Sequence, residues 1–367
     1  MSSYHLERNE YFIDFQMRYN AIIHFSQKTG TETMGAESDD QLTRILSLDS
    51  FSSEQLREDT VKDSGLDHLQ MSNGFFQGQL LRCQMDDVIL DTGVYSQDML
   101  VMGTMPDDGV TLGYILGADR PGYFNGTRLN RHDLVVCSEG AAMDSYHLPA
   151  GTQWVALQLP RQQLESQGIS APVSPGVEIF SGFNPAKLQL GRKLETVFHE
   201  IYLEARVTEP GHHIDPEAMA ETLTIDFRQA LDAVTGLEQK KFKLSAGQRL
   251  RVLYRVDEFI RNNLDRAIRI GELCALTGVS QRSLEYLFRD HYGVSPVRYL
   301  ATRRVHAVRE QLLKMRPEET TVASLAAAYG FRHPGRFAQA YRLQFGEFPS
   351  ATLACVASRS KTGGQPR

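Results

Sequence analysis

Apolar residues recur at helical spacing in the last third of the chain, and one pattern occurs there twice. Between residues 270 and 350, two stretches each read as a helix, a tight turn and a second helix. Gly278 and Gly330 end the first helix of each copy, and Gly293 and Gly346 end the second. Glycine is the usual residue where a helix ends in a left-handed backbone conformation. The repeat therefore predicts two copies of one supersecondary unit.

Each copy has the layout of a helix-turn-helix unit. Leu284 and Leu287 in the first copy, and Phe337 and Ala340 in the second, recur at helical spacing. We expect these residues to pack against the first helix of their own unit. In helix-turn-helix proteins the second helix lies in the major groove of DNA, so the sequence predicts two recognition helices.

Residues 295–315, between the two copies, read as one long helix. Its apolar positions include Val297, Leu300, Val305 and Leu312. At about 1.5 Å per residue this helix would be roughly 31 Å long, close to the roughly 34 Å repeat of B-DNA. A helix of that length would hold two recognition helices in successive major grooves on one face of the DNA.

Polar side chains on the outer faces of these helices are suited to contact DNA. Arg pairs with guanine edges, Gln with adenine and Glu with cytosine. A solvated polar face on an ordinary helical hairpin is the alternative, but two arginine-rich copies favour DNA. Arg298 and Arg309 on the long helix are further candidates for phosphate contacts, with solubilising charge as an open alternative for each arginine there. The candidate DNA-contacting residues are Gln281, Arg282, Glu285, Tyr286, Arg289, Arg303, Arg304, Arg332, His333, Arg336, Gln339 and Arg342.

A specific set of residues in the second copy is shared with a known family. The set is Ala327-Ala328-Tyr329-Gly330-Phe331, Gly335-Arg336-Phe337-Ala338, Tyr341-Arg342, Phe345-Gly346-Glu347 and Pro349-Ser350. With it, the stretch from about residue 250 to 353 resembles the C-terminal DNA-binding domain of the AraC/XylS family of transcriptional regulators. One departure is His333-Pro334-Gly335, where the family more often has serines. The resemblance implies two helix-turn-helix subdomains that bind adjacent major grooves beside a promoter, with RNA polymerase as a partner.

Residues 43–160 have the pattern of a β-rich domain. Short apolar runs at 79–83, 88–92, 100–104, 110–116, 134–138 and 153–159 are separated by Gly, Asp, Asn and Pro. Asn125-Gly126 is a hairpin signal between apolar flanks. Many short strands at this spacing predict a small barrel or sandwich. The family resemblance implies a cupin-like barrel that binds a small effector, and 124–154 looks broadly similar to sensor domains of ethanolamine-regulator-like members.

Two amphipathic stretches, 188–203 and 219–234, follow the β-rich region and predict helices, with a break at 210–213. In related regulators such helices often form the interface of a homodimer. Packing against the barrel is an equally good alternative.

The pattern divides the chain into five parts. We expect an unassigned N-terminal extension at 1–42, a β-rich effector-sensing domain with trailing helices at 43–235, and a linker at 236–247. An all-α DNA-binding domain would occupy 248–355 and a flexible tail 356–367.

The charge of the chain is unevenly distributed between these parts. Residues 247–367 carry 20 Lys and Arg against 10 Asp and Glu, a net charge of +10. The whole chain has a net charge of −6, so the remainder carries −16. A basic C-terminal third favours contact with nucleic acid there, whereas the acidic remainder does not.

Composition and cysteine use indicate the compartment. The chain of 367 residues is 41% hydrophobic and 23% charged, as in globular proteins. We find neither a signal peptide nor an apolar run long enough for a membrane span. Its four cysteines are far apart and include no CxxC motif, which indicates reduced thiols. The sequence thus predicts a cytoplasmic protein.

Catalytic and cofactor motifs do not emerge from the sequence. His132, Asp133 and His147 lack the HxH pairing of a catalytic cupin, so we expect neither metal nor cofactor. An enzyme or an architectural DNA binder that carries this DNA-binding domain remains as an alternative. Aromatic residues on inward strand faces could bind a ligand, with core packing as the other explanation. These aromatic candidates are Tyr95, Tyr114, Tyr123, Phe124, Tyr146 and Trp154.

The sequence as a whole predicts a sequence-specific transcriptional regulator. Its sensor domain would bind a small molecule and change how the DNA-binding domain is presented to a promoter. Family resemblance favours activation over repression.

Overall fold

The computed structural model describes residues 43–50, 53, 56, 61, 64–85, 87–166, 176–206, 216–233, 244–266 and 268–354. The expected N-terminal extension, most of the expected linker, the break at 210–213 and the expected tail lie outside these residues. The β-rich and helical regions belong to one unit, residues 41–367.

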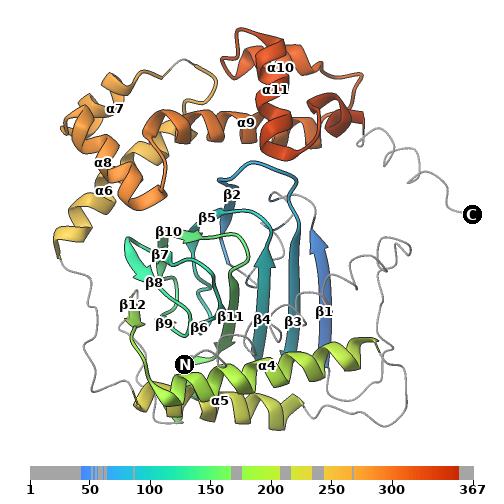
Figure 1. Cartoon of the computed structure of the whole chain (residues 1–367), viewed down its shortest axis with the longest axis vertical. Helices are drawn as coiled ribbons and strands as arrows, with labels where there is room; N and C mark the ends of the chain where they lie inside the picture. Colours follow the sequence, from blue (N-terminus) through green and yellow to red (C-terminus); the bar gives the residue numbers. More distant parts are fainter. Residues whose placement is uncertain are drawn as a thin grey trace, which may run out of the picture. The chain divides into compact units, whose positions relative to one another are not determined.

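Two antiparallel sheets build the β-rich domain (Figure 1). The larger sheet has seven strands in the order β1 (Thr43–Ser50), β3 (Gly78–Met85), β4 (Val88–Tyr95), β11 (Gln153–Leu159), β6 (Val110–Gly117), β9 (Leu134–Cys137) and β12 (Val177–Phe180). The smaller sheet has five strands in the order β2 (Asp67–Gln70), β5 (Met99–Thr104), β10 (Ala142–Leu148), β7 (Gly122–Phe124) and β8 (Thr127–Leu129).

The described strands do not close into a barrel. Strands β1 and β12 form the edges of the larger sheet, and β2 and β8 form those of the smaller one. Of the two architectures expected from the strand spacing, the open two-sheet sandwich is the one observed. Barrels and sandwiches share short strands and frequent turns, and only the pairing of the strands distinguishes them.

An apolar core lies between the two sheets. Val101 and Met143 enter it from the smaller sheet, and Ile115, Trp154 and Ala156 enter it from the larger one. Residues at alternate positions of a strand point to opposite faces, so each sheet contributes one face to this core.

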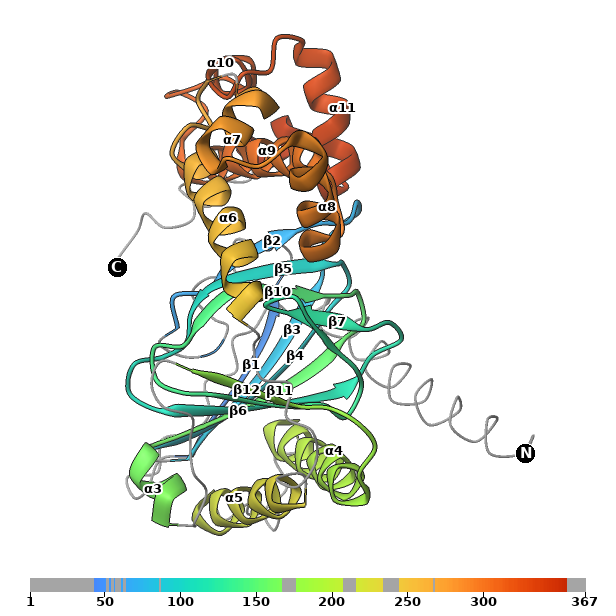
Figure 2. The same cartoon turned by 90° about the vertical axis from the view of Figure 1, so that its left-hand side faces the viewer.

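Helices α4 (Pro185–Arg206) and α5 (Pro216–Asp232) cover the other face of the larger sheet (Figure 2). Leu190 and Phe227 join Leu112 and Leu157 of the sheet in one apolar cluster. Packing against the sheet, one of the two expected roles of these helices, is therefore observed. A short helix, α3 (Arg161–Ser166), follows β11.

The predicted Asn-Gly hairpin is confirmed between β7 and β8. Asn125 and Gly126 both have positive φ, 46° and 76°, which matches the twist of a two-residue hairpin turn. Strand β10 was not predicted, because polar residues interrupt its apolar pattern and its register shifts between Met143 and Tyr146. Such a bulge adds a residue and breaks the alternation on which sequence reading depends.

The helical domain contains the predicted repeat. After α6 (Leu244–Arg261), the first unit is formed by α7 (Ile270–Thr277) and α8 (Gln281–Tyr292), and the second by α10 (Val322–Ala328) and α11 (Pro334–Phe345). Helix α9 (Pro296–Lys314) connects the two units. The four glycines predicted at helix ends all have positive φ, between 70° and 81°.

Helix α9 belongs to two apolar cores. Tyr299 and Leu300 pack with the first unit, and Val305 and Leu312 pack with the second. Val297 is instead 61% exposed. The side of the helix that faces the core is the one that carries Tyr299, and Val297 does not lie on it. The prediction for Ala340 was also wrong: it is exposed, and its neighbour Tyr341 is buried.

Candidate nucleic-acid interface and internal cavity

Helix α8 has one polar and one apolar side. The Nε2 atom of Gln281 donates a hydrogen bond to Oε1 of half-buried Glu285 at 3.0 Å, which holds both side chains along the helix surface. Tyr286 is 60% exposed although it is a large aromatic residue. The apolar side packs into the core through Leu284 and Phe288. The exposed candidate residues of this helix are Gln281, Arg282, Tyr286 and Arg289.

The second unit repeats this arrangement on α11. Phe337 and Tyr341 are buried, so the other side of the helix faces outward. His333 occupies the N-cap position without a side-chain capping bond in the described structure, so its imidazole is not used to start the helix. The guanidinium of Arg342 lies 4.8 Å from the ring centre of Phe348. The exposed candidates of this unit are Arg332, His333, Arg336, Gln339 and Arg342.

Arg303 of the long helix lies in the interior and not on the predicted DNA face. Its side chain is 7% exposed. Its guanidinium donates to Asp67 Oδ2 at 3.0 Å, to Asp257 Oδ1 at 3.1 Å and to the Tyr299 hydroxyl at 2.9 Å. These partners come from β2, α6 and α9, so Arg303 joins three elements. A phosphate contact from Arg303 does not fit this burial.

The other arginines of the helix differ in exposure. Arg309 is buried and donates to Glu347 at 2.7 Å, so it too is unsuited to bind a phosphate. Arg304 is half-buried, and one of its terminal nitrogens donates to the Arg266 carbonyl at 2.6 Å. Burial lowers the pKa of Arg304. Arg298 is exposed.

Polar contacts join the helical domain to the smaller sheet. Gln70 Nε2 donates to the Gln344 carbonyl at 2.7 Å, and Gln344 Nε2 donates to the Gln70 carbonyl at 2.9 Å. His306 Nε2 lies 3.2 Å from the same Gln70 carbonyl. Apolar contacts surround these bonds, with Leu69 and Leu100 in the core of the first unit. The sequence does not predict this interface, because partners so far apart along the chain leave no local pattern.

His291, near the end of α8, is part of the same interface. Its Nε2 forms a hydrogen bond with the hydroxyl of Ser145 on β10. The side chain is 7% exposed, and burial lowers its pKa from 6.5 to about 4. The imidazole is therefore neutral at pH 7.

We expect this histidine to make stability depend on pH. The unfolded chain takes up the proton near pH 6.5, whereas the folded chain resists it until about pH 4. The contribution of the neutral imidazole is thus complete above pH 6.5 and is lost as pH falls toward 4. This group should lower the free energy of unfolding by about 2 kcal/mol between pH 7 and pH 5. Chemical denaturation at both pH values measures the change.

The matched variant is His291→Gln, which cannot take up a proton. It should lack this part of the pH dependence while other titrating groups act equally in both proteins. Equal pH dependence in wild type and variant would show that His291 is not buried in solution.

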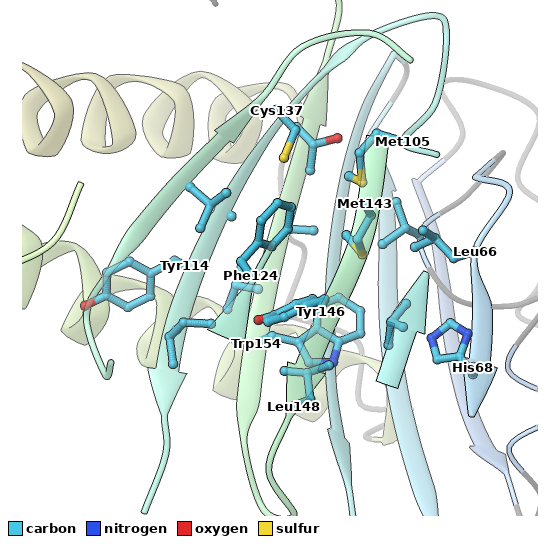
Figure 3. A pocket seen from close by; sticks show the side chains of 18 of the residues that line it. Leu66, His68, Met105, Tyr114, Phe124, Cys137, Met143, Tyr146, Leu148 and Trp154 are labelled. Atoms are coloured by element: carbon cyan, nitrogen blue, oxygen red, sulfur yellow. The ribbon is translucent and has the colours of Figure 1, made fainter. Parts of the chain in front are cut away.

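A cavity of about 70 Å³ lies within the β-rich domain (Figure 3). Four of the six aromatic candidates line this cavity with their side chains: Tyr95, Phe124, Tyr146 and Trp154. Tyr114 also borders it, but the hydroxyl of Tyr114 donates to the Lys187 carbonyl at 2.7 Å on the opposite face of the sheet. Tyr123 is not among the lining residues.

Among the residues of this domain that the structure describes, the thiols and histidines do not assemble into a metal site. Cys83 and Cys137 are both buried, and burial raises the pKa of Cys137 to about 12. Nδ1 of His132 lies 2.6 Å from the Tyr114 hydroxyl. In the part of the chain that the structure describes, no three His, Cys, Asp or Glu residues group closely enough to hold a metal ion. Over the same residues, no helix is long and apolar enough to cross a membrane.

Comparisons with known proteins agree on the helical domain. The helix-turn-helix domain family matches residues 273–354. XylDLEGF operon transcriptional activator 2 of Pseudomonas putida is 38% identical over 113 residues, which are 29% of this chain and 72% of that protein. Further activators of this operon are matched over about 30% of their length.

Two further similarities differ in extent. A probable thc operon regulatory protein of Rhodococcus erythropolis is 28% identical over 243 residues, which are 63% of this chain and 70% of that protein. This match is longer than the helical domain and therefore includes part of the β-rich domain. A crystal structure of a probable AraC family regulator from Rhodopseudomonas palustris is 36% identical and covers 29% of this chain and 97% of its own, with a TM-score of 0.27.

Proposed function

We propose the function of this chain from its family. The chain belongs to the AraC/XylS family of transcriptional regulators. Its C-terminal helical domain is a DNA-binding domain of that family, and the chain is a regulator and not an enzyme. What the whole chain recognises and how it responds are our proposals.

We propose that α8 and α11 are the recognition helices and that their exposed polar sides read adjacent segments of promoter DNA. The supporting observation is that both helices bury their apolar side and leave Arg, Gln and Tyr side chains outward. The proposed contacts are Gln281, Arg282, Glu285, Tyr286, Arg289, Arg332, His333, Arg336, Gln339 and Arg342. Arg298 and Arg304 are proposed to contact phosphates, whereas Arg303 is left out because it is buried.

Binding of the full-length chain to the DNA that flanks its own gene tests this function. Titrations with competitor DNA and with salt separate specific from non-specific binding, because phosphate contacts weaken as salt rises. We expect binding that survives competitor DNA. Equal, salt-sensitive binding to unrelated DNA would contradict a promoter-specific regulator.

We also propose that the β-rich domain senses a small molecule through its cavity. Two facing antiparallel sheets are the arrangement of jelly rolls, which include cupins, and this supports a cupin-like sensor. The cavity supports ligand binding, because ligand sites are typically apolar hollows with a few polar groups.

Strands of the smaller sheet connect the cavity to the helical domain. On β2, His68 lines the cavity while its neighbours Asp67 and Leu69 contact the helical domain. On β5, Val101 lines the cavity while Leu100 packs on the helices. A ligand that moves this sheet would therefore change contacts on its other face. We propose that effector binding changes, in this way, the contacts that hold the DNA-binding domain against the smaller sheet.

The remaining features of the proposal follow from the family. A promoter-bound regulator works where the chromosome lies, so we propose that the protein is cytoplasmic. We also propose that it activates transcription through RNA polymerase. A homodimer is proposed as well, with α4 and α5 as its interface, because each presents exposed residues beside those packed on the sheet.

A further inference from the structure

The lining of the cavity carries no formal charge among the described residues. Its side chains are aliphatic, aromatic or sulfur-containing, apart from the imidazole of His68 and the hydroxyl of Thr111. Cys137 stays protonated, because burial raises its pKa to about 12. A charged ligand would lose its hydration here and find no opposite charge in return, which is unfavourable.

Two buried polar groups belong to residues that line the cavity. In the part of the chain that the structure describes, neither Nε1 of Trp154 nor the hydroxyl of Thr111 has a hydrogen-bond partner. Both side chains are more than nine-tenths buried, at 6% and 3% exposure. The indole nitrogen can only donate, whereas the hydroxyl can donate or accept. A ligand acceptor near Trp154 would therefore satisfy a donor that is costly to leave unpaired.

The size of the cavity limits the ligand. Its volume of about 70 Å³ is roughly half of the ~150 Å³ apolar cavity that admits benzene in an engineered protein. Met105 and Met143 line the cavity (Figure 3), and methionine side chains adapt readily to new shapes. A molecule with one six-membered ring would enter if these two side chains yield.

We infer that the cavity takes a small, uncharged and largely apolar molecule, about one ring in size, with a single hydrogen-bond acceptor that meets Trp154 Nε1. The inference rests on the proposed sensing function and names the chemical class of its effector.

Trp154 provides a direct readout, because it is the single tryptophan of the chain. Its emission can be followed in the full-length protein as three probes of matched size are added: benzyl alcohol, benzoate and benzylamine, which are neutral, anionic and cationic at pH 7. We expect saturable binding of benzyl alcohol, with both charged probes bound at least about tenfold more weakly.

Two outcomes would overturn the inference. One is binding of benzoate or benzylamine as tight as that of benzyl alcohol. The other is the absence of any saturable change with benzyl alcohol.

Variants separate cavity binding from other effects on emission. Ala156→Leu places a larger side chain at the lining and should weaken binding of benzyl alcohol at least about tenfold. Thr111→Val keeps the shape but removes the hydroxyl, which can accept a hydrogen bond from the O–H of benzyl alcohol, and a loss of about threefold to tenfold is expected. Thr196→Val, at an exposed position of α4, should bind as the wild type does. Unchanged binding in both cavity variants would place the probe elsewhere and contradict the inference.

The DNA titration is carried out without any probe. Its result therefore tests the function as a regulator independently of the proposed class of ligand. A chain that binds its promoter but not benzyl alcohol would lose the ligand class and keep its function as a regulator. A chain that binds benzyl alcohol but no specific DNA would lose the proposed function alone.

Discussion

Arg303→Ala is expected to lower the free energy of unfolding by about 3–5 kcal/mol. The substitution removes the buried guanidinium that pairs with Asp67 and Asp257, whose side chains are only 17% and 7% exposed. Arg261, which is 42% exposed, stays as a partner of both carboxylates. Removing one member of a buried ion pair costs far more than the pair itself contributes, because the remaining charge stays desolvated. Chemical denaturation of the full-length chain measures the loss.

The control for this prediction is Arg298→Ala on the same helix. Arg298 is exposed, so its loss should change stability by no more than about 0.5 kcal/mol. If Arg303→Ala proved as stable as Arg298→Ala and lost affinity for every DNA sequence by the same factor, Arg303 would be the phosphate contact that its position in the sequence suggested.

Arg282→Ala and Arg336→Ala should each reduce the preference for specific over non-specific DNA by about 1–3 kcal/mol. Each arginine lies exposed near the start of a proposed recognition helix, the part that usually meets base edges. Loss of a bidentate contact to guanine would relax the choice of base at one position. Competition between specific and unrelated DNA, at fixed salt, measures the effect.

Arg316→Ala serves as the control for these two variants. Arg316 is exposed and pairs with Glu319 at 2.7 Å beyond the end of α9. Its loss should leave the ratio of specific to non-specific affinity unchanged. A uniform loss of affinity for every sequence in Arg282→Ala would make that residue a phosphate contact instead.

Local signals were enough to predict the helical domain. A glycine that ends a helix, such as Gly278 or Gly346, acts through its own backbone conformation and can be recognised without tertiary structure. Ser280 likewise caps α8 by accepting a hydrogen bond from the Ser283 amide at 3.1 Å. The repetition of these signals fixed both units and the helix between them.

Features that depend on distant contacts could not be predicted. Arg303 sits on the same helix as exposed Arg298, and its partner Asp67 lies 236 positions away. Nothing local distinguishes Arg303 from exposed Arg298. The cupin-like barrel that the family resemblance implied is likewise not confirmed, since strand spacing does not determine which strands form the edges of a sheet.

The sequence predicts part of the lining of the cavity. Aromatic residues in short strands were recognised as possible ligand contacts, and the structure brings Tyr95, Phe124 and Trp154 together. Tyr114 could not be separated from them, because the sequence does not reveal which face of a strand points inward. Its hydroxyl bonds to the chain at Lys187 on the far side of the sheet.

Selection of preferred DNA sequences by the full-length protein tests the central claim most directly, when it is repeated with Arg282→Ala and Arg336→Ala. Two recognition helices predict two sequence elements centred about one helical turn apart. Each variant should relax the sequence of one element and leave the other unchanged. A single element, or both variants relaxing the same element, would contradict a protein that reads DNA with two helices.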